Sequence, residues 1–412
     1  MNRLMSMPID RRKLLSLGLA GAASLGLVAC GGLGEDSDTV DVTITVWGPQ
    51  EDQSAENGKW LQTQCEAFAA EHPEWTLAFK YGVCAEGDVE KSIVTDPSAG
   101  ADVYLFANDQ IPNLVKCVGI AELGGVWVDG IKNNNSATTV ETVTYEGGVY
   151  GVPFTANTWF MYYDKSVFAE EDITSLDAML QKGKVAFPLD VAWYISSFYV
   201  ANGCTLFGPD GGDAAAGIDF GGDKAIAVTN YLVDLVANPN FTNGDVSTSA
   251  GASAFFSGTW DYQKGLDAYG DNLGIAPAPT ITIDGEPKQM KAFAGSKAVG
   301  ANPSTDLYHK HPEVAVALAA YLGGASAQQA HYELRDVIPT DVSLVMDDAL
   351  AKAQMDTMAY ASIVQPLQDG MSNYWTPAES MGKELVSHKV THQNAAEKTE
   401  AMNAAMNTSV VQ

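Results

Sequence analysis

The chain has 412 residues, of which 46% are hydrophobic and 18% charged, so it holds ample material for a globular core and is not a disordered polypeptide. Its formal net charge is −28 at pH 7, from 23 Lys and Arg against 51 Asp and Glu. A surface of that sign repels phosphate backbones and argues against nucleic-acid binding, but it does not identify a ligand because acidity commonly serves solubility.

The first thirty residues have the arrangement of an export signal. Basic residues up to Lys13 precede an apolar run, 14–28, and the stretch ends in Leu27-Val28-Ala29-Cys30. This run is shorter than the roughly 20 residues that span a bilayer. The segment resembles a bacterial lipoprotein signal peptide, which implies removal of residues 1–29 and a lipid on Cys30 that holds the protein at the extracellular face of the cell membrane. An ordinary secretory signal is the alternative, and Arg11-Arg12 leaves the twin-arginine and general secretion routes open.

Removal of residues 1–29 takes four of the 23 basic and one of the 51 acidic residues, so 19 against 50 remain and the net charge becomes −31. The polar, glycine-rich stretch 31–38 predicts a flexible tether within the segment 30–39, and folding is expected to begin at Val40. Cys65, Cys84, Cys117 and Cys204 are widely spaced, so disulfides and buried free thiols are both compatible with them. Neither Cys-x-x-Cys nor His-Glu-x-x-His occurs, so no metal or cofactor is expected.

Strand and helix patterns alternate after the tether. Val42, Ile44 and Val46 alternate with polar residues and predict a strand, and helical spacing follows over 60–70. Further strands are expected at 77–83 and at 101–107, where the run is apolar enough to be buried on both faces. This order is typical of a parallel sheet with helices on both sides.

The alternation continues into a second α/β segment and then becomes mainly helical. Expected strands are a pair around Pro153 within 148–163 and single strands at 184–188, 252–257 and 273–276, and expected helices are 192–202 and 224–237. Beyond Pro312 the predicted helices are 314–322, 325–334, 347–360, 378–386 and 395–407. We therefore expect two α/β lobes, each a central sheet flanked by helices, followed by a helical C-terminal part.

Aromatic residues gather at predicted loop edges and helix starts, outside the periodic apolar faces. Sugar rings pack their C–H faces on aromatic rings, while their hydroxyls need carboxylate and amide partners. The aromatic candidates for ligand binding are Trp159, Trp193, Tyr194, Trp260, Tyr262, Tyr374 and Trp375, and the polar candidates are Glu51, Asp52, Asn108, Asp109 and Asn157. Loops after parallel strands commonly bind ligands. For any one tryptophan the alternative is core packing, and for any one carboxylate it is solvation, so the hypothesis depends on the whole set.

Six segments that follow the leader resemble, in order and spacing, the extracellular solute-binding lipoproteins of ABC importers, specifically the maltose/maltodextrin-binding group. They cover essentially the whole mature chain: VTITVWGPQEDQ, ADVYLFANDQIPNLVKCVGIAEL, YEGGVYGVPFTANTWFMYYDKSVF, FFSGTWDY, FAGSKAVGANP and SNYW. The resemblance implies a two-lobed periplasmic-binding-protein-like fold of type II, with an N-lobe of 40–156 plus 291–340 and a C-lobe of 157–290 plus 341–412. The crossings would fall near 156–159, 287–290 and 340–343.

The function implied by this resemblance is capture of an oligosaccharide, maltose or maltodextrin, between the lobes. A monomer would deliver the sugar unchanged to ABC permease subunits, and no P-loop motif is present, so the ATPase would be a separate chain. A surface glycoside hydrolase, or the same fold with another sugar or a non-sugar solute, are the alternatives.

Residue by residue, Asp109 matches an aspartate that accepts sugar hydroxyls, and Trp260 and Trp375 match stacking tryptophans. Tyr262 replaces a second aromatic residue, and Trp193 stands where a stacking tyrosine is usual. Three positions depart from the family pattern: Asn157 is often acidic, Gln110 is familiar as arginine, and Val191, beside Asp190, stands where a glutamate contributes. These departures leave glucan length and linkage open.

Overall fold

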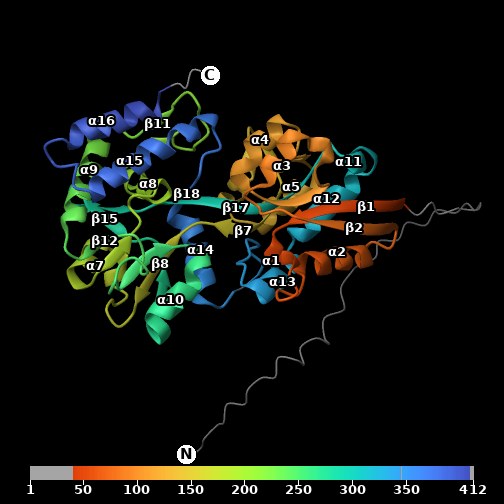
Figure 1. Cartoon of the computed structure of the whole chain (residues 1–412), viewed down its shortest axis with the longest axis horizontal. Coiled ribbons are helices and arrows are strands. Elements are labelled where there is room, and N and C mark those ends of the chain that lie inside the picture. The colour runs from red at the N-terminus through yellow and green to blue at the C-terminus, as the bar shows by residue number, and fades with distance from the viewer. Residues whose placement is uncertain (1–39, 345, 409–412) are drawn as a thin grey trace, which may run out of the picture. The chain divides into compact units, whose positions relative to one another are not determined.

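The computed structural model describes residues 40–344 and 346–408, so Cys30 and the predicted tether lie outside the described residues. The described chain contains two α/β halves, each built around its own sheet (Figure 1). This arrangement confirms the predicted fold class. Among the described helices, none combines the length and apolarity that crossing a bilayer requires.

The first half is built on a six-stranded sheet in the order β18-β17-β3-β1-β2, with β7 also paired to β17. Its strands are β1 (Val40–Gly48), β2 (Trp75–Val83), β3 (Val103–Ala107), β7 (Val152–Asn157), β17 (Ala292–Ala301) and β18 (Ser362–Val364). β1 pairs in parallel with β2 and β3, as predicted, but β17 runs antiparallel to β3 and β7. The predicted parallel pairing is thus present among β1, β2 and β3, whereas the sheet as a whole is mixed, because β17 adds antiparallel pairs.

Side chains alternate between two cores on the opposite faces of this sheet. Val103 and Leu105 of β3 lie in one core, while Tyr104 and Phe106 lie in the other, which confirms that this strand is buried on both faces. The first face packs on α2 (Trp60–Glu71), α12 (Pro312–Leu322) and α13 (Ala325–Arg335), and the second on α3 (Val89–Thr95), α4 (Ile111–Lys116) and α5 (Val126–Asn134). Shorter elements of this half are α1 (Gln50–Gln53), η1 (Pro97–Ala99), η2 (Asn108–Gln110), α6 (Ala137–Thr142), α11 (Asp306–Lys310) and a small sheet of β4 (Glu122–Leu123), β5 (Thr144–Tyr145) and β6 (Gly148–Tyr150).

The second half is built on a five-stranded sheet in the order β12-β9-β13-β8-β14. Its strands are β8 (Phe160–Asp164), β9 (Val185–Phe187), β12 (Phe241–Asn243), β13 (Ala254–Ser257) and β14 (Leu273–Ala276). β8 runs antiparallel to both β13 and β14, whereas β9 pairs in parallel with β12. This sheet is therefore also mixed. Its strand β8 directly follows β7 of the first half in the chain.

Helices cover both faces of the second sheet. The larger core packs on α7 (Leu176–Lys182), α8 (Ala192–Ala201), α9 (Gly222–Ala237), α15 (Trp375–Val386) and α16 (Ala395–Met406). The smaller core includes residues of α14 (Ala349–Tyr360), with Tyr262 of α10 (Tyr262–Tyr269) packed against it. The remaining elements are η3 (Asp172–Thr174), η4 (Thr259–Asp261), η5 (Gly270–Asn272), η6 (Asp369–Asn373) and the hairpins of β10 (Thr205–Leu206) with β11 (Ile218–Asp219) and β15 (Thr280–Ile283) with β16 (Glu286–Gln289).

The predicted pair of strands around Pro153 is instead three strands, because the chain leaves the strand conformation at Gly151, between β6 and β7, and again at Thr158 and Trp159, between β7 and β8. Pro153 lies inside β7 opposite Ala298, at the point where the pairing register with β17 shifts. A proline lacks the amide proton of a regular ladder, and a bulge absorbs that defect. The strand consequently continues to the crossing between the two halves.

Candidate functional site

The carboxylate of Asp109 and the amide of Asn108 have different environments, although the residues are adjacent in η2. Asp109 is exposed, whereas Asn108 is buried. The Asn108 Nδ2 donates to the Thr142 carbonyl (2.9 Å), and its Oδ1 accepts from the Ser296 amide (2.8 Å). Asn108 therefore fixes the turn that presents Asp109, and we exclude it from the proposed ligand contacts.

The two acidic candidates after β1 also separate. Glu51 in α1 is exposed, whereas the Asp52 side chain is fully buried. Asp52 Oδ1 accepts from His331 Nε2 (2.8 Å) and from the Arg335 guanidinium, both in α13. The structure thus corrects the hypothesis for Asp52, whose carboxylate ties α1 to α13 instead of facing solvent.

A partly exposed pair of tryptophans lies in the second half. Trp193 at the start of α8 is half-buried, and Trp260 in η4 is 54% exposed. Their ring centroids are 5.9 Å apart with an interplanar angle of 39°. The two indoles form a tilted, solvent-accessible platform of the kind that a sugar chain can cover.

Three of the other aromatic candidates belong to the larger core of the second half. Trp159 and Tyr374 have no exposed surface, and Tyr194, which stacks on Trp159 at 5.2 Å, is 9% exposed. The Tyr374 hydroxyl donates to the Ala192 carbonyl (2.6 Å). A ring enclosed by protein offers no face to a sugar, so we exclude these three from the proposed ligand contacts.

The Tyr374–Ala192 hydrogen bond nevertheless joins two regions of the proposed site. Trp375 follows Tyr374 at the start of α15, and Trp193 follows Ala192 in α8. The bond therefore holds the starts of the two aromatic-bearing helices together. The remaining candidates, Asn157 at the end of β7 and Tyr262 at the start of α10, are partly exposed.

A pocket of about 530 Å³ brings Asp109 and Trp375 together from the two halves. Pro112, Asn113 and Lys116 contribute from the first half and Met371 and Ser372 from the second, and the segment 365–369 also lines the pocket. Lys116 Nζ and Asp369 Oδ1 form an ion pair of 2.5 Å at this pocket. Although the Asp109 side chain reaches solvent, the protein packed around it displaces part of its hydration and, together with the smaller effect of the Glu90 charge, raises its pKa above the ordinary value.

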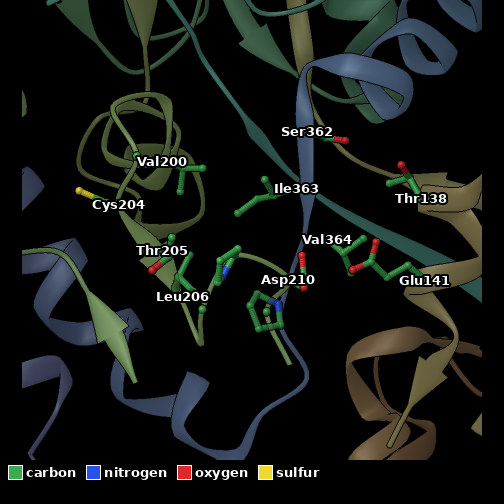
Figure 2. A pocket seen from close by; sticks show the side chains of 15 residues that line it. Thr138, Glu141, Val200, Cys204, Thr205, Leu206, Asp210, Ser362, Ile363 and Val364 are labelled. Atoms are coloured by element: carbon green, nitrogen blue, oxygen red, sulfur yellow. The ribbon is translucent and has the colours of Figure 1, made fainter. Parts of the chain in front are cut away.

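Two more pockets adjoin the same connecting segment. Figure 2 shows the first, of about 430 Å³, lined by Thr138 and Glu141 of α6, by Asp210 and by Ile363 and Val364 of β18. The second, of about 520 Å³, shares Glu141 and Asp210 and extends to Gln368. Burial, followed by the charge of Asp210, raises the pKa of Glu141. These pockets show that the segment 362–369 is solvent-accessible along much of its length.

Lys116 and the segment 365–369, which also line the Asp109 pocket, were not predicted from the sequence. Their signal was position, since Lys116 follows Asp109 by two helical turns and the segment precedes SNYW. Gln110, where the family has an arginine, is buried and donates through Nε2 to the Glu86 carbonyl (2.5 Å) while accepting from the Glu90 amide. It therefore has a structural role.

Within the described residues, the four cysteines are free thiols, and no three His, Cys, Asp or Glu side chains gather in a way that could hold a metal ion.

A family model described as bacterial extracellular solute-binding protein matches residues 63–357. A maltooligosaccharide ABC transporter solute-binding lipoprotein of Streptococcus pneumoniae is 24% identical, over 92% of this chain and 93% of that protein. The maltodextrin-binding protein MdxE of Bacillus subtilis is 25% identical, over 72% and 75% of the two chains. A solved structure with acarbose shares 47% identity and a TM-score of 0.78, covering 89% of this chain and 99% of its own. The unliganded maltodextrin binding protein MalE1 from L. casei BL23 has a TM-score of 0.81 at 22% identity, covering 90% and 100%, which shows the same fold.

Proposed function

The chain belongs to the bacterial extracellular solute-binding proteins, and from that premise we propose that it binds maltose or short maltodextrins outside the cell and delivers them to an ABC permease. The observation that carries the proposal is the pocket that is lined by Asp109 of the first half and by Trp375 of the second. The maltooligosaccharide- and maltodextrin-binding relatives, and the 47% identical structure with acarbose, support an oligosaccharide as the ligand.

The side chains of the proposed site divide the work of sugar binding. The exposed Asp109 carboxylate accepts hydrogen bonds from sugar hydroxyls, which are stronger than those between neutral groups. Trp375, Trp193 and Trp260 supply indole surface for the C–H faces of successive sugar rings. The 39° tilt between Trp193 and Trp260 favours a curved α-linked chain over a flat ribbon, because neighbouring rings of a curved chain are also tilted.

Binding would couple to movement of the two halves. A sugar that contacts Asp109 and Trp375 together binds best when the halves approach each other, so its differential affinity shifts the population toward that state. The permease can then distinguish the loaded protein from the empty one. We propose lobe boundaries at 156/157, 290/291 and 340/341, which lie near the ends of β7 and β16 and in the connection from α13 to α14. One strand beyond the last boundary, β18, returns to the first sheet.

The proposed function includes attachment to the cell membrane and does not include hydrolysis of the sugar. The protein acts as a monomer, is held at the extracellular face of the membrane by a lipid on Cys30, and releases its sugar unhydrolysed. Fractionation tests the anchor: Cys30→Ser should move the protein from the membrane fraction to the medium, while retention in the membrane would contradict lipid attachment.

Isothermal titration of the wild-type protein with maltose to maltoheptaose, and with acarbose, tests the ligand class. We expect saturable binding and a matching rise in Tm, because a ligand of the folded state stabilises it. The control is Trp127→Ala, an exposed tryptophan of α5 that should leave the affinity unchanged. Binding of a different solute without any response to α-glucans would refute the ligand class, and shortened sugar after long incubation would indicate a hydrolase.

A further inference from the structure

The ring of Trp260 lies directly over Gly258, two residues earlier in the chain. A Cβ built on Gly258 would be 2.1 Å from Trp260 Cζ3 and 2.3 Å from Cη2, far inside van der Waals contact. The backbone of Gly258 is extended, with φ −93° and ψ −167°, a conformation open to any residue. The glycine is therefore needed for the space that it leaves to the indole and not for its backbone freedom.

The backbone under the ring is itself held in place. The buried Tyr162 hydroxyl of β8 donates to the Gly258 carbonyl (2.7 Å), and the same carbonyl accepts from the Asp261 amide (3.2 Å). Asp261 Oδ2 in turn accepts from the Ser257 hydroxyl (2.7 Å). These hydrogen bonds fix the turn between β13 and α10, which carries Trp260.

Lys264 of α10 forms ion pairs that stabilise the same turn. Lys264 Nζ lies 3.1 Å from Asp261 Oδ1 and 2.7 Å from Asp245 Oδ2, and all three side chains are partly buried. Asp245 Oδ1 accepts from the Ser247 amide (2.9 Å) and the Thr248 amide (3.1 Å), so the lysine connects the turn to an ordered loop. The bond to Lys264 and the bonds within the loop lower the pKa of Asp245 despite its partial burial.

We propose that Gly258 and Lys264 are positioning residues, which set the Trp260 ring against Trp193 before any ligand arrives. The inference rests on the proposed function, because it concerns the use of this aromatic pair by a glucan. An exposed tryptophan that is already oriented loses less side-chain entropy on binding, so pre-orientation strengthens the affinity. Neither residue needs to touch the sugar.

Titration of maltotriose into Gly258→Ala is the direct test. The new methyl group displaces the indole, and we expect the Kd to rise by about 3- to 10-fold. Because the backbone accepts alanine, the Tm should change little. Gly130→Ala is the matched control, since a Cβ at Gly130 meets nothing within 4 Å among the described residues. An unchanged Kd for Gly258→Ala would overturn the inference.

A double-mutant cycle shows whether Gly258 acts through the ring. In a Trp260→Ala background, Gly258→Ala should weaken binding no further, because there is no indole left to displace. Equal weakening in both backgrounds would contradict the proposal. Lys264→Met should also raise the Kd and Lys264→Arg should restore it, since either cation can bridge the two carboxylates. Failure of the wild-type protein to bind any glucan would instead refute the proposed function.

Discussion

Replacement of Asp52 by asparagine separates a structural role of the loop after β1 from a ligand-binding one. Asp52 is fully buried and accepts from His331 and Arg335 of α13, so the substitution leaves a guanidinium without its counter-charge. Breaking a buried ion pair in this way costs about 3–5 kcal/mol. With an unfolding entropy of about 2.1 cal/mol/K per residue, the described chain of roughly 370 residues loses about 0.8 kcal/mol of stability per degree near its Tm. The expected fall in Tm is therefore about 4–6 °C.

The pH dependence of the stability that Asp52 contributes follows from the same contacts. Burial alone would raise the pKa of Asp52, but the hydrogen bond from His331 and the positive charges of His331 and Arg335 outweigh it and lower the pKa. A lowered folded-state pKa stabilises the protein above the unfolded value of about 3.9, and that contribution is lost as the pH falls through the folded-state pKa. The Tm difference between wild type and Asp52→Asn should accordingly narrow below about pH 4.

Differential scanning calorimetry with and without maltotriose measures both effects. The control is Glu51→Gln, whose exposed side chain should leave the Tm of the free protein unchanged. We expect Asp52→Asn to lower the Tm both with and without maltotriose, and to leave the rise in Tm that the sugar causes unchanged. An unchanged Tm together with a lost increment would refute this reasoning and return Asp52 to the ligand contacts.

Four further substitutions test the proposed site and its surroundings. Asp109→Asn should weaken glucan binding by about 1.5–3 kcal/mol. Because the pKa of Asp109 is raised, the glucan affinity of the wild type should fall on acidification at a pH above the ordinary aspartate range, while the affinity of the variant should not change with pH. The same pH dependence of affinity in both proteins, measured by titration calorimetry, would contradict this. Trp375→Ala should lower affinity by about 1–3 kcal/mol in the same assay, and unchanged affinity would make the ring a core residue. Trp159→Ala should instead cost about 3–5 kcal/mol of unfolding free energy in urea, a value near zero being incompatible with its burial. Lys116→Met should change that free energy by less than about 1 kcal/mol, because its ion pair is exposed; a larger effect would show that the pair is not screened by solvent.

Local patterns predicted the strands and helices whose periodicity is set by a single core. The alternation in 42–46 and the fully apolar run of β3 are examples, and both were confirmed. β17 was missed because its sequence, AFAGSKAVGA, is rich in Ala and Gly, which are not typical of strands. Its strand conformation comes from pairing with β3 and β7, more than 100 residues away in the chain.

The candidate site was only partly readable from the sequence for a similar reason. Trp159 and Trp260 both follow a threonine at an element boundary, yet one is fully buried and the other is 54% exposed. The difference arises from packing on α8 and β13, which no local pattern encodes. Asp52 is a second case, because its partner His331 lies 279 residues further along the chain. Asp109, in contrast, was placed on an exposed turn by the strand that precedes it.

The dependence of the first sheet on β17 also governs how the chain can fold while it is being made. Phe293 of β17 packs in the larger core of the second half, while Val299 and Ala301 pack in the first half, so neither core is complete before this strand exists. Roughly 190 residues separate β3 from its partner, which corresponds to about 10–40 s of synthesis at 5–20 residues per second. During that interval the six-stranded sheet is incomplete, because β17 and β18 have not yet been made. A chain with this topology reaches its native state only after the C-terminal helices, which complete the larger core of the second half, have also been made.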